Sequence, residues 1–535
     1  MNKVVAFIPV RLTSSRLPEK HLRMIGDRSL LSWVIKRLKD SAVIDTIVVC
    51  SPDEAGSKPL RHFCVEEGVE LFLFNGDEND VVGRLTSASC FFDADICVLA
   101  SGDCPLHSAS TINLLVSSLL DNVSVDIANV GALRGRPPIH EGLLVMRRAV
   151  WEKANIYSDT PPLREHLFPV LYCKPDFFRE FNVIEVQDDD VFYIEKHRIS
   201  IDTPSDLTFH LGLFDELSRC GQVYELEFVM RLLSHEPKLK RINSHVKQKK
   251  LTDRTKRILF FVTSVANYGY GNLLRALEVA KNCLDIYGMG VHFVVSDSTG
   301  LDYVRRSHYD GSIFSDWQAL TENVKDKDAI IFDVNSLFQV NDDFLSLVAS
   351  RMSILSIDNV QPWSRYADKI IIPTAHYTGE TYENLEHGAS YVVIRSAIQN
   401  LKRLNRKKED VIVVYSSGDE YDELINEEIS QLLFRSNQLR VIEYRSFSPD
   451  FIEQLSKSKY LISPMGMSAY EGHYLGVKVI VVGRNERELT DISAFNRFFN
   501  ESLATFDGAG AVRIAETIDN LANVIKTGNE YANFA

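Results

Sequence analysis

Short apolar runs recur along this chain, and segments with helical spacing of apolar residues separate them. In the first part of the chain these runs lie at 4–10, 45–50, 69–74 and 94–100, and residues 30–38 carry apolar side chains at helical spacing. Runs of this length predict buried strands. Their alternation with amphipathic helices predicts a parallel, doubly wound α/β sheet.

The same alternation begins afresh after residue 257 and predicts two further Rossmann-like halves, divided near residues 396–405. A last group of apolar residues, Ile514, Ile518, Leu521 and Ile525, falls on one helical face and predicts a helix that docks on a domain. The expected strands lie at 257–263, 291–296, 329–334, 353–357 and 369–372 in one half, and at 411–415, 439–444, 460–463 and 478–482 in the other.

Residues 237–257 differ from both flanks because they are polar, strongly basic and without a clear period. In an acidic chain such a stretch predicts a solvated linker. A nucleic-acid patch is the alternative, but no aromatic residues are interleaved with the cations. The expected organisation is therefore a first domain at 1–236, a linker at 237–257, and a second domain at 258–535 with halves of about 258–396 and 397–535.

Charge and cysteine content restrict the class of protein further. The formal net charge of −14 disfavours a general nucleic-acid binder, which needs spare cations. The eight cysteines contain no Cys-x-x-Cys and none follows residue 283, which favours reduced thiols in a cytoplasmic protein. No apolar stretch is long enough to span a bilayer, and the apolar start is too short for a signal peptide.

The loop after the first expected strand carries Arg11, Ser14, Arg16 and Lys20. Arginine forks and a mobile lysine charge suit phosphate oxygens. Open α/β sheets bind ligands at the carboxyl ends of their strands. The loop therefore predicts a polyphosphate site, with a solvated basic loop as the alternative.

Two aspartates far apart in the sequence each follow an apolar run. Asp103 follows residues 94–100, and Asp202 ends the run Arg198-Ile-Ser-Ile. Carboxylates at such ends suit Mg²⁺, which keeps substrate phosphates among its ligands. The alternative for Asp103 is a helix cap. Asp206 is expected to be a cap or a surface group.

Taken together, these motifs resemble the sugar-activating cytidylyltransferases, namely the CMP-Kdo and CMP-sialic acid synthetases and above all the spore-coat SpsF proteins. The resemblance covers about the first 240 residues. It implies a Mg²⁺-dependent enzyme that transfers CMP from CTP to a sugar acid, with Arg11, Lys20, Asp103 and Asp202 as catalytic residues. It also implies Asp103 and Asp202 as metal ligands, and a homodimer formed through this domain.

The same resemblance suggests contacts to base and sugar. Arg84 matches a residue near the nucleotide base, with a solvent-facing helix position as the alternative. Arg164 lies in a stretch on the acceptor-sugar side. With His140 and His166 it is a candidate to hold the substrate, although each could instead be a structural hydrogen-bond donor.

The second domain carries glycine-rich segments before expected helices, where backbone N–H groups can approach a phosphate. Gly269, Gly271 and Asn272 form one of these segments, and Gly466, Ser468 and Glu471 belong to a later one. They resemble the SpsG and PseG group of UDP-sugar hydrolases, which have a GT-B fold. The resemblance implies that these residues bind a UDP-sugar, with Glu471 on the ribose. The alternative for Glu471 is a first-turn helix charge.

One residue departs from that group's pattern. Asn272 stands where the group has histidine, and an amide cannot act as a general base at neutral pH. Either another group such as His473 or Asp297 takes over, or the domain binds a nucleotide sugar without hydrolysing it, or it transfers the sugar. Met465 and Met467 stand where the group prefers glycine and are expected to narrow the phosphate pocket. The identity of the activated sugar, the oligomeric state and the order of two activities are not determined by the sequence.

Overall fold

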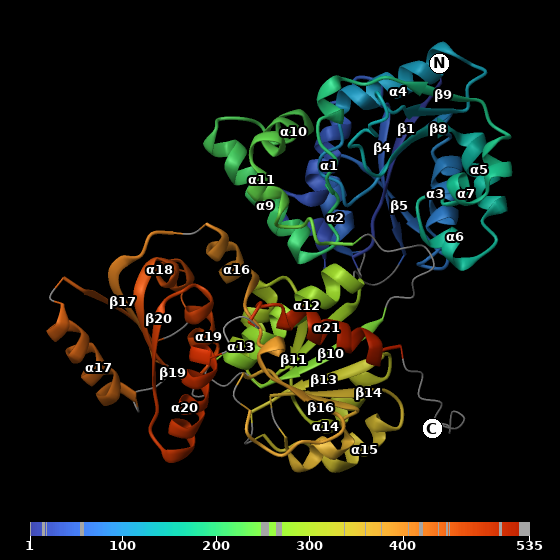
Figure 1. Ribbon diagram of the computed structural model, residues 1–535. Helices are drawn as coiled ribbons and strands as arrows, with labels where there is room; N and C mark the ends of the chain where they lie inside the picture. Colours follow the sequence, from blue (N-terminus) through green and yellow to red (C-terminus); the bar gives the residue numbers. More distant parts are fainter. Residues whose placement is uncertain are drawn as a thin grey trace. The chain divides into compact units, whose positions relative to one another are not determined.

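The chain divides into two units, 1–254 and 255–535, in the computed structural model (Figure 1). The structure describes residues 2–12, 17, 19–53, 58–247, 256–263, 270–335, 338–358, 360–375, 377–404, 406–416, 421–436, 438–445, 448, 450–501 and 506–523. Each unit is an α/β unit built on parallel strands, as the alternation of apolar runs and helices predicts.

The first unit is built on a seven-stranded sheet of order β5-β4-β1-β6-β8-β7-β9. Its strands are β1 (Val4–Pro9), β4 (Thr46–Pro52), β5 (Glu70–Phe74), β6 (Ile96–Ala100), β7 (Ile127–Val130), β8 (Leu143–Arg147) and β9 (Val183–Val186), and β2 (Met24–Ile25) pairs with β3 (Arg28–Ser29) apart from it. Its helices are α1 (Leu30–Lys39), α2 (Lys58–Glu67), α3 (Val81–Phe91), α4 (Ala109–Asp121), α5 (Arg148–Tyr157), α6 (Pro161–Glu165), α7 (Val170–Cys173), α8 (Pro175–Phe178), α9 (Pro204–Arg219), α10 (Leu226–His235) and α11 (Pro237–Lys240), with 3-10 turns η1 (Lys20–Leu22) and η3 (Asp190–Tyr193).

Alternation along β1 explains why both faces of this sheet are covered. Val4, Ala6 and Ile8 join a core with α1, α4, α9 and α10, whereas Val5 and Phe7 join a second core with α3 and α5. Successive side chains of a strand point to opposite faces, so an apolar run without alternation needs a helical layer on each side.

The first sheet is not wholly parallel, which corrects the expectation. β1 pairs in parallel with β4 and β6, but β8 pairs antiparallel with β6 and with β7. The reason is local: β8 follows β7 through residues 131–142 without a helical crossover, so the chain returns beside the strand it has just left.

Two further expectations for this unit are also corrected. The run before Asp202 is not a strand, because the N–H groups of Ile199 and Ser200 donate to the Glu141 carboxylate instead of a neighbouring strand. The start of the expected linker is folded into the first unit. There α11 forms, Lys240 pairs with Glu195 at 3.0 Å, and the buried Asn243 donates to Asp206.

The second unit contains a seven-stranded parallel sheet, β12-β11-β10-β13-β14-β15-β16, and a four-stranded parallel sheet, β18-β17-β19-β20. The strands are β10 (Arg257–Val262), β11 (Gly290–Val295), β12 (Asp310–Ile313), β13 (Ala329–Asp333), β14 (Ser353–Ile357), β15 (Lys369–Ile372), β16 (Leu385–His387), β17 (Glu409–Tyr415), β18 (Arg440–Tyr444), β19 (Ser458–Pro464) and β20 (Lys478–Val482). The helices are α12 (Gly271–Tyr287), α13 (Ser298–Arg306), α14 (Trp317–Val324), α15 (Asp342–Ala349), α16 (Ser396–Arg403), α17 (Asp422–Arg435), α18 (Phe451–Lys457), α19 (Met467–Tyr474), α20 (Glu486–Glu501) and α21 (Gly510–Leu521), with 3-10 turns η4 (Pro362–Tyr366) and η5 (Ala389–Tyr391).

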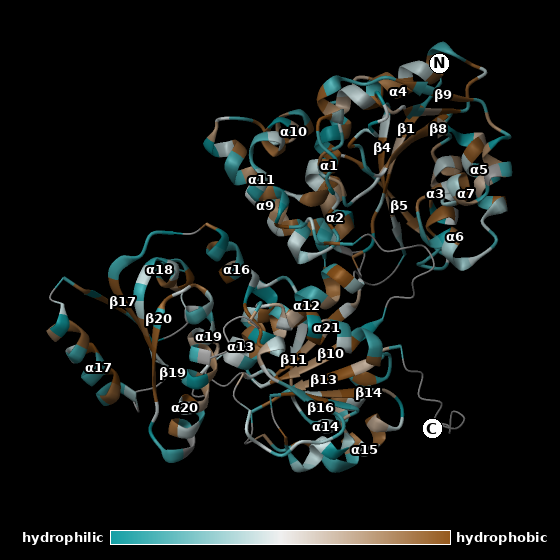
Figure 2. Cartoon of the chain, in the orientation of Figure 1, coloured by the Kyte–Doolittle hydropathy of each residue, from teal (hydrophilic) through white to brown (hydrophobic). Residues whose placement is uncertain are grey.

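Every strand expected in this unit is present, whereas β12 and β16 were not expected. Figure 2 shows that the strands of the large sheet are mostly hydrophobic. The predicted docking of the last helix is confirmed for the described residues, since Ile514 and Ile518 of α21 are buried in one core with α12. The last helix therefore packs on the first half, so the expected division of halves at residue 397 assigns this helix to the wrong half.

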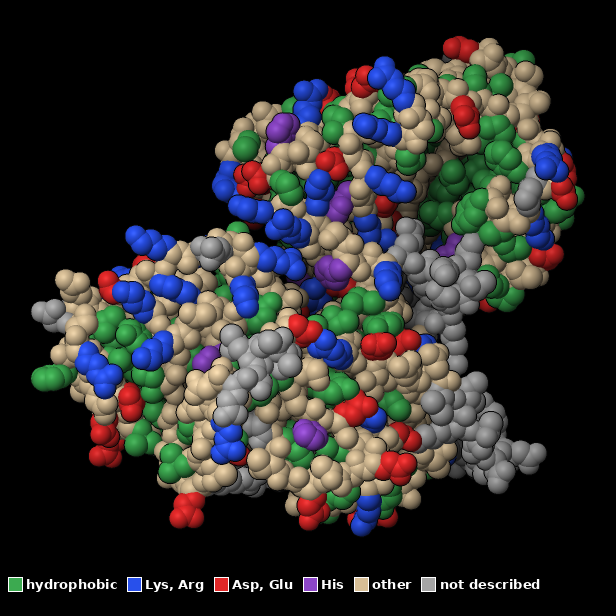
Figure 3. All heavy atoms as spheres, in the orientation of Figure 1, with side chains coloured by type: hydrophobic (Ala, Val, Ile, Leu, Met, Phe, Trp, Pro, Cys, Tyr) green, Lys and Arg blue, Asp and Glu red, His purple; other side chains and the backbone are tan. Residues whose placement is uncertain are grey.

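Within the described ranges, no helix combines the length and apolar character that crossing a bilayer requires. None of the eight cysteines, all of which lie in those ranges, forms a disulfide. On the face that Figure 3 displays, acidic and basic side chains are interspersed over each unit.

Candidate functional site

The carboxyl ends of β1 and β6 lie side by side, because the two strands pair in parallel with Phe7 opposite Leu99. The chain continues from β1 into Arg11 and the turn η1, and from β6 into residues 101–106. Both expected phosphate-binding and metal-binding segments therefore leave the sheet at one edge.

At this edge the structure brings Lys20, Asp103 and Asp202 together. The Lys20 Nζ lies 3.0 Å from Asp103 Oδ2 and 2.9 Å from Asp202 Oδ1. It also donates to the Ile201 carbonyl oxygen at 3.2 Å. The Ile201 N–H in turn donates to the Asp103 carbonyl oxygen at 2.8 Å. One cation is thus held between two carboxylates that are 99 positions apart in the sequence (103 and 202).

The second oxygen of each carboxylate is held by a different donor. Ser101 Oγ donates to Asp103 Oδ1 at 2.5 Å, and Arg198 Nη2 donates to Asp202 Oδ2 at 2.5 Å. Arg198 also contacts the fully buried Asp206 at 3.2 Å. Charge-assisted bonds of this kind fix geometry as well as charge. Both carboxylates are therefore oriented whether or not Lys20 is present.

Electrostatics keep Asp103 ionised. Burial by itself would raise its pKa, but the Lys20 ammonium and the Ser101 hydroxyl outweigh burial and lower the pKa below its ordinary value. Asp103 is therefore ready to bind a cation at neutral pH. Asp206, by contrast, forms a capping box with Thr203 at the start of α9, which confirms the expectation of a cap.

Close backbone packing supports the Asp103 segment. An added Cβ at Gly102 would lie 2.8 Å from the Pro9 carbonyl oxygen and 3.1 Å from His21 Nε2. His21 is buried. Its pKa is lowered to about 3, mainly by burial and to a smaller extent by the nearby Lys20 charge. The neutral His21 ring thus packs closely against Gly102, the residue before Asp103.

Glu141 was not among the residues expected from the sequence, and Arg198 had no expected role. Glu141 accepts from the N–H groups of Ser200 at 2.9 Å and Ile199 at 3.4 Å, so it holds the segment that leads to Asp202. The only sequence signal for Arg198 is its position four residues before Asp202. Glu141 has no such signal, because its partners lie 58 and 59 positions away.

Other predicted ligands of the first unit lie in different surroundings. Arg11 is half-buried, and its Nη1 donates to Asn79 Oδ1 at 3.2 Å. Arg84 is buried, which rules out the solvent-facing alternative. Ser14 and Arg16 lie outside the described residues.

Arg164 is a structural clamp in this structure. Its guanidinium donates to both oxygens of Asp80, at 2.9 and 2.8 Å, and to Asn155 and Ser158. Asp80 is itself the N-cap of α3. His140 lies 2.9 Å from Asp188, and Thr111 donates to the same carboxylate oxygen at 2.6 Å. Arg164 and His140 thus have the structural hydrogen-bond role that the sequence analysis left open for them.

In the second unit, the start of α12 lies at the carboxyl edge of the large sheet. Strand order reverses between β10 and β13 there, which is where such sheets bind ligands. Gly271 begins the helix, and Asn272 Nδ2 donates to the Asp333 carbonyl oxygen at 3.4 Å. Gly269 lies outside the described residues.

A charged cluster surrounds Asn272. Arg275 donates to both oxygens of the fully buried Asp333, at 2.9 and 2.6 Å, and to Asp358 at 2.9 Å. Asp358 has φ +76°, a strained value for a residue with a side chain. This cluster was not expected from the sequence. The sequence does contain an indication of it, because Asp333 and Asp358 lie at the ends of two expected strands.

The residues of the later segment are differently placed. Gly466 is exposed and Ser468 lies in the first turn of α19. Glu471 is fully buried, and its oxygens accept from Arg395 at 2.6 and 2.5 Å. In this structure Glu471 is thus the acid of an internal ion pair. Its contact to a ribose stays a prediction.

Both replacement bases named from the sequence have structural contacts. The His473 ring stacks on Phe499, with centroids 4.0 Å apart, and burial lowers its pKa to about 4. Asp297 caps α13 through the Gly300 N–H at 2.7 Å. Asp333 and Asp358 are the carboxylates that are linked to Asn272 through Arg275, whose Nη2 donates to Asn272 Oδ1 at 3.4 Å.

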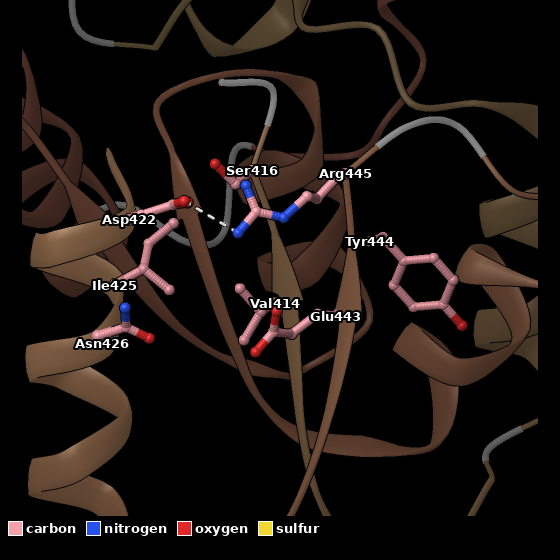
Figure 4. Close-up of a pocket in the computed structure, with 8 residues that line it drawn as sticks. All are labelled: Val414, Ser416, Asp422, Ile425, Asn426, Glu443, Tyr444 and Arg445. Atoms are coloured by element: carbon pink, nitrogen blue, oxygen red, sulfur yellow. Dashed lines mark hydrogen bonds and ion pairs between the residues drawn. The ribbon is translucent and has the colours of Figure 1, made fainter. Parts of the chain in front are cut away.

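A small polar pocket lies at the carboxyl ends of β17 and β18. Figure 4 shows the Asp422 carboxylate facing the Arg445 guanidinium, at 2.9 Å, with Ser416 beside them. Because Glu443 also lines the pocket, two carboxylates accompany one guanidinium, and this net negative charge disfavours a phosphate.

No group of three or more histidine, cysteine or acidic side chains is placed to hold a metal ion within the parts of the chain that the structure describes. The acidic pair in the first unit presents one oxygen from each of two carboxylates at a common point. This donor set fits Mg²⁺, which binds proteins through one or two carboxylates and keeps waters and substrate phosphates.

Comparison with known proteins agrees with this architecture. A family model described as cytidylyltransferase matches residues 5–251. An uncharacterized protein of Methanocaldococcus jannaschii is 30% identical over 252 residues, which cover 46% of this chain and 97% of that protein. The spore coat polysaccharide biosynthesis protein SpsF of Bacillus subtilis is 23% identical over 241 residues, covering 44% of this chain and 96% of SpsF.

A solved cytidylyltransferase from Leptospira borgpetersenii is 24% identical and covers 45% of this chain and 97% of that chain, with a TM-score of 0.39. The sequence matches carry the assignment: through its first unit, the chain belongs to the cytidylyltransferase family.

Proposed function

We propose that the first unit transfers CMP from CTP to a hydroxyl of an acidic, nonulosonate-like sugar. One observation carries this proposal: Asp103 and Asp202 both contact the Lys20 ammonium. They do so at the carboxyl end of the sheet, where Arg11 follows β1. The family assignment supports the cytidylyl group. Similarity to enzymes named 3-deoxy-manno-octulosonate cytidylyltransferases supports a sugar acid as acceptor.

In the proposed reaction, a sugar hydroxyl oxygen attacks the α-phosphorus of CTP. A new P–O bond forms, the bond from the α-phosphorus to the bridging oxygen breaks, pyrophosphate leaves, and the hydroxyl proton passes to solvent water. Phosphoryl chemistry of this kind depends on positioning and charge neutralisation. Arg11, Arg16 and Lys20 supply the positive charge for the β- and γ-phosphates and for the departing pyrophosphate.

Asp103 and Asp202 would hold Mg²⁺, which when bound neutralises charge on the α-phosphate and eases ionisation of the attacking hydroxyl. Ser101 and Arg198 keep one oxygen of each carboxylate fixed. The other two oxygens face a single point, since both contact the same Lys20 Nζ. The residues present thus fit one divalent ion shared with a phosphate.

The test is pyrophosphate release from CTP by the full chain, measured over a panel of 2-keto sugar acids with Mg²⁺. Release with one acid and a CMP-sugar product is expected. Asp103→Asn keeps the shape of the side chain but removes its charge, so it should lower the rate by about 10²–10³. The matched control is Asp176→Asn, because Asp176 and its partner Arg179 are both exposed. Normal turnover by Asp103→Asn would reject the site.

For the second unit we propose a GT-B-like module that binds a nucleotide sugar, with UDP-sugar hydrolysis as its candidate activity. The supporting observation is the cluster of Asn272, Arg275, Asp333 and Asp358 where the strand order reverses. Alternatives are a non-catalytic scaffold and a glycosyltransferase. Incubation with UDP-sugars separates them: free sugar means hydrolysis, sugar on an acceptor means transfer, and binding without turnover means a scaffold.

The two modules together would form a bifunctional enzyme of polysaccharide biosynthesis. A homodimer formed through the first unit and a cytoplasmic location remain part of this proposal. Sedimentation of the full chain tests the dimer.

A further inference from the structure

The position of Lys20 has a consequence for metal binding. Its ammonium group contacts three oxygens: one from Asp103, one from Asp202 and the Ile201 carbonyl. Its side chain is 11% exposed, so this group is largely withdrawn from water. The ammonium therefore lies at the point that both carboxylates share, which is where the proposed function requires a divalent ion.

A lysine and a divalent ion cannot use these oxygens together, because like charges at such separations repel strongly in a partly buried site. We propose that Lys20 holds the divalent-ion position in the nucleotide-free protein and leaves it when the ion and the triphosphate bind together. This inference rests on the proposed function of the first unit.

The Lys20 side chain can move away from the two carboxylates, whereas Arg198 and Ser101 are fixed in their contacts with them. Lysine carries a point charge on a flexible stem. Arg198 is held by both Asp202 and Asp206, and Ser101 holds Asp103. When Lys20 departs, the two carboxylates therefore keep their orientation.

Coupling between the two ligands follows. A divalent ion that binds without nucleotide must displace the Lys20 ammonium, and no phosphate is then present to pair with that ammonium. A triphosphate supplies that new partner, so each ligand should strengthen binding of the other by the same factor. The free protein would then discriminate against metal that comes without nucleotide.

The test uses Mn²⁺ alone, with the nucleotide-free full chain, and measures free Mn²⁺ by electron paramagnetic resonance. Lys20→Met retains the length of the side chain without its charge and should bind Mn²⁺ at least about tenfold more tightly than the unchanged protein. Lys20→Arg keeps the charge and should stay within about threefold of the unchanged protein. Lys36→Met is the matched control, because Lys36 pairs with the single exposed carboxylate of Asp40, and it should have no effect.

Equal or weaker Mn²⁺ binding by Lys20→Met would overturn the inference. So would tight binding that survives in the double variant Lys20→Met, Asp103→Asn, since the ion would then lie elsewhere. Because Lys20→Met leaves one oxygen of each carboxylate without its cation, a second measurement covers loss of stability. Mn²⁺ should raise the melting temperature of this variant more than that of the unchanged protein, and an equal rise also counts against the inference.

Failure of the proposed function would look different. If no sugar acid supports pyrophosphate release while Lys20→Met still tightens Mn²⁺ binding, the reaction is wrong but the inference stands. If the unchanged protein is an active cytidylyltransferase and Lys20→Met does not tighten binding, only the inference fails.

Discussion

The Ile201 N–H donates to the carbonyl oxygen of Asp103 at 2.8 Å, and this bond joins the two acidic segments of the first unit. Asp202 follows directly, so its carboxylate lies within reach of the cation that Asp103 also contacts. The site is thus assembled by the backbone as well as by charged side chains.

Gly102 should tolerate no side chain. In Gly102→Ala the added Cβ would meet the Pro9 carbonyl oxygen at 2.8 Å and the buried His21 ring at 3.1 Å, and neither the backbone nor the buried ring can easily move. We expect a loss of about 1–3 kcal/mol in the free energy of unfolding, with reduced CMP transfer because Asp103 is displaced. Urea unfolding and pyrophosphate release measure the two effects.

The matched control for that variant is Gly212→Ala in α9. Its nearest neighbour is the Leu239 Cδ2 at 3.3 Å, a side-chain tip that can move, and alanine favours a helix over glycine by ~1 kcal/mol. Gly212→Ala should therefore be neutral or stabilising. If both variants behave alike, the close approach at Gly102 is not what matters.

Arg164 should contribute to stability more than to substrate binding. Arg164→Met removes the clamp on Asp80, Asn155 and Ser158. We expect a loss of about 1–3 kcal/mol in the free energy of unfolding, because charge-assisted bonds are lost and a partly buried carboxylate loses its partner. The KM for CTP and for the sugar acid should change little.

Arg179→Met is the control for Arg164, since its ion pair with Asp176 is exposed and should change stability by less than about 0.5 kcal/mol. A large rise in KM for the sugar acid without loss of stability in Arg164→Met would restore the sugar-binding role expected from the sequence.

His107 should make the first unit less stable in mild acid. Its Nε2 donates to the Ser101 carbonyl oxygen at 3.1 Å, and burial lowers its pKa from 6.5 to about 4. Between these values the unfolded chain binds a proton that the folded protein does not. The free energy of unfolding therefore falls as the pH falls from 6.5 towards 4, by ~1.4 kcal/mol per pH unit for this residue.

His107→Gln replaces the ring N–H donor by an amide N–H donor that does not titrate. Urea unfolding at pH 6.5 and pH 5 should show a shallower decline for this variant than for the unchanged protein. His62→Gln is the control, because His62 is exposed and should leave the decline unchanged. Parallel declines for His107→Gln and the unchanged protein would contradict the prediction.

Arg275 should be essential for the fold of the second unit. Arg275→Met leaves the fully buried Asp333 without its bidentate partner. Removing one partner of a buried ion pair lowers the free energy of unfolding by about 3–5 kcal/mol. Arg365→Met removes only an exposed pair with Asp342 and should cost less than about 0.5 kcal/mol. Urea unfolding of the two variants should differ accordingly, and equal stabilities would show that the cluster is not a structural centre.

Strands were the most predictable part of the fold. The core strands such as β13 and β14 are continuous apolar runs between polar turns, and such runs are recognisable without knowledge of their neighbours. β12 was missed because Asp310–Ile313 contains one strongly apolar residue and lies at the edge of its sheet. β8 was not among the expected strands, and its antiparallel direction depends on the connection and not on the residues of the strand.

Side-chain partners were much less predictable. The convergence of Asp103 and Asp202 was expected because both were placed at the ends of apolar runs and by resemblance to a family. Glu471 and Arg164 were expected to contact ligands. Both have protein partners in this structure, and their ligand contacts stay predictions. An arginine or glutamate has the same chemistry in a ligand site and in an internal ion pair, so sequence cannot distinguish the two.

The sequence by itself determined the α/β class, the positions of the strongly apolar strands and the residue types available for phosphate and metal chemistry, because these depend on local periodicity and on side-chain chemistry. Only the tertiary structure decided that Lys20 lies between Asp103 and Asp202, that Arg275 joins Asp333 to Asp358, and that α21 packs beside α12. These relationships join segments distant in the chain. They depend on which strands become neighbours and on the balance of burial and charge after folding.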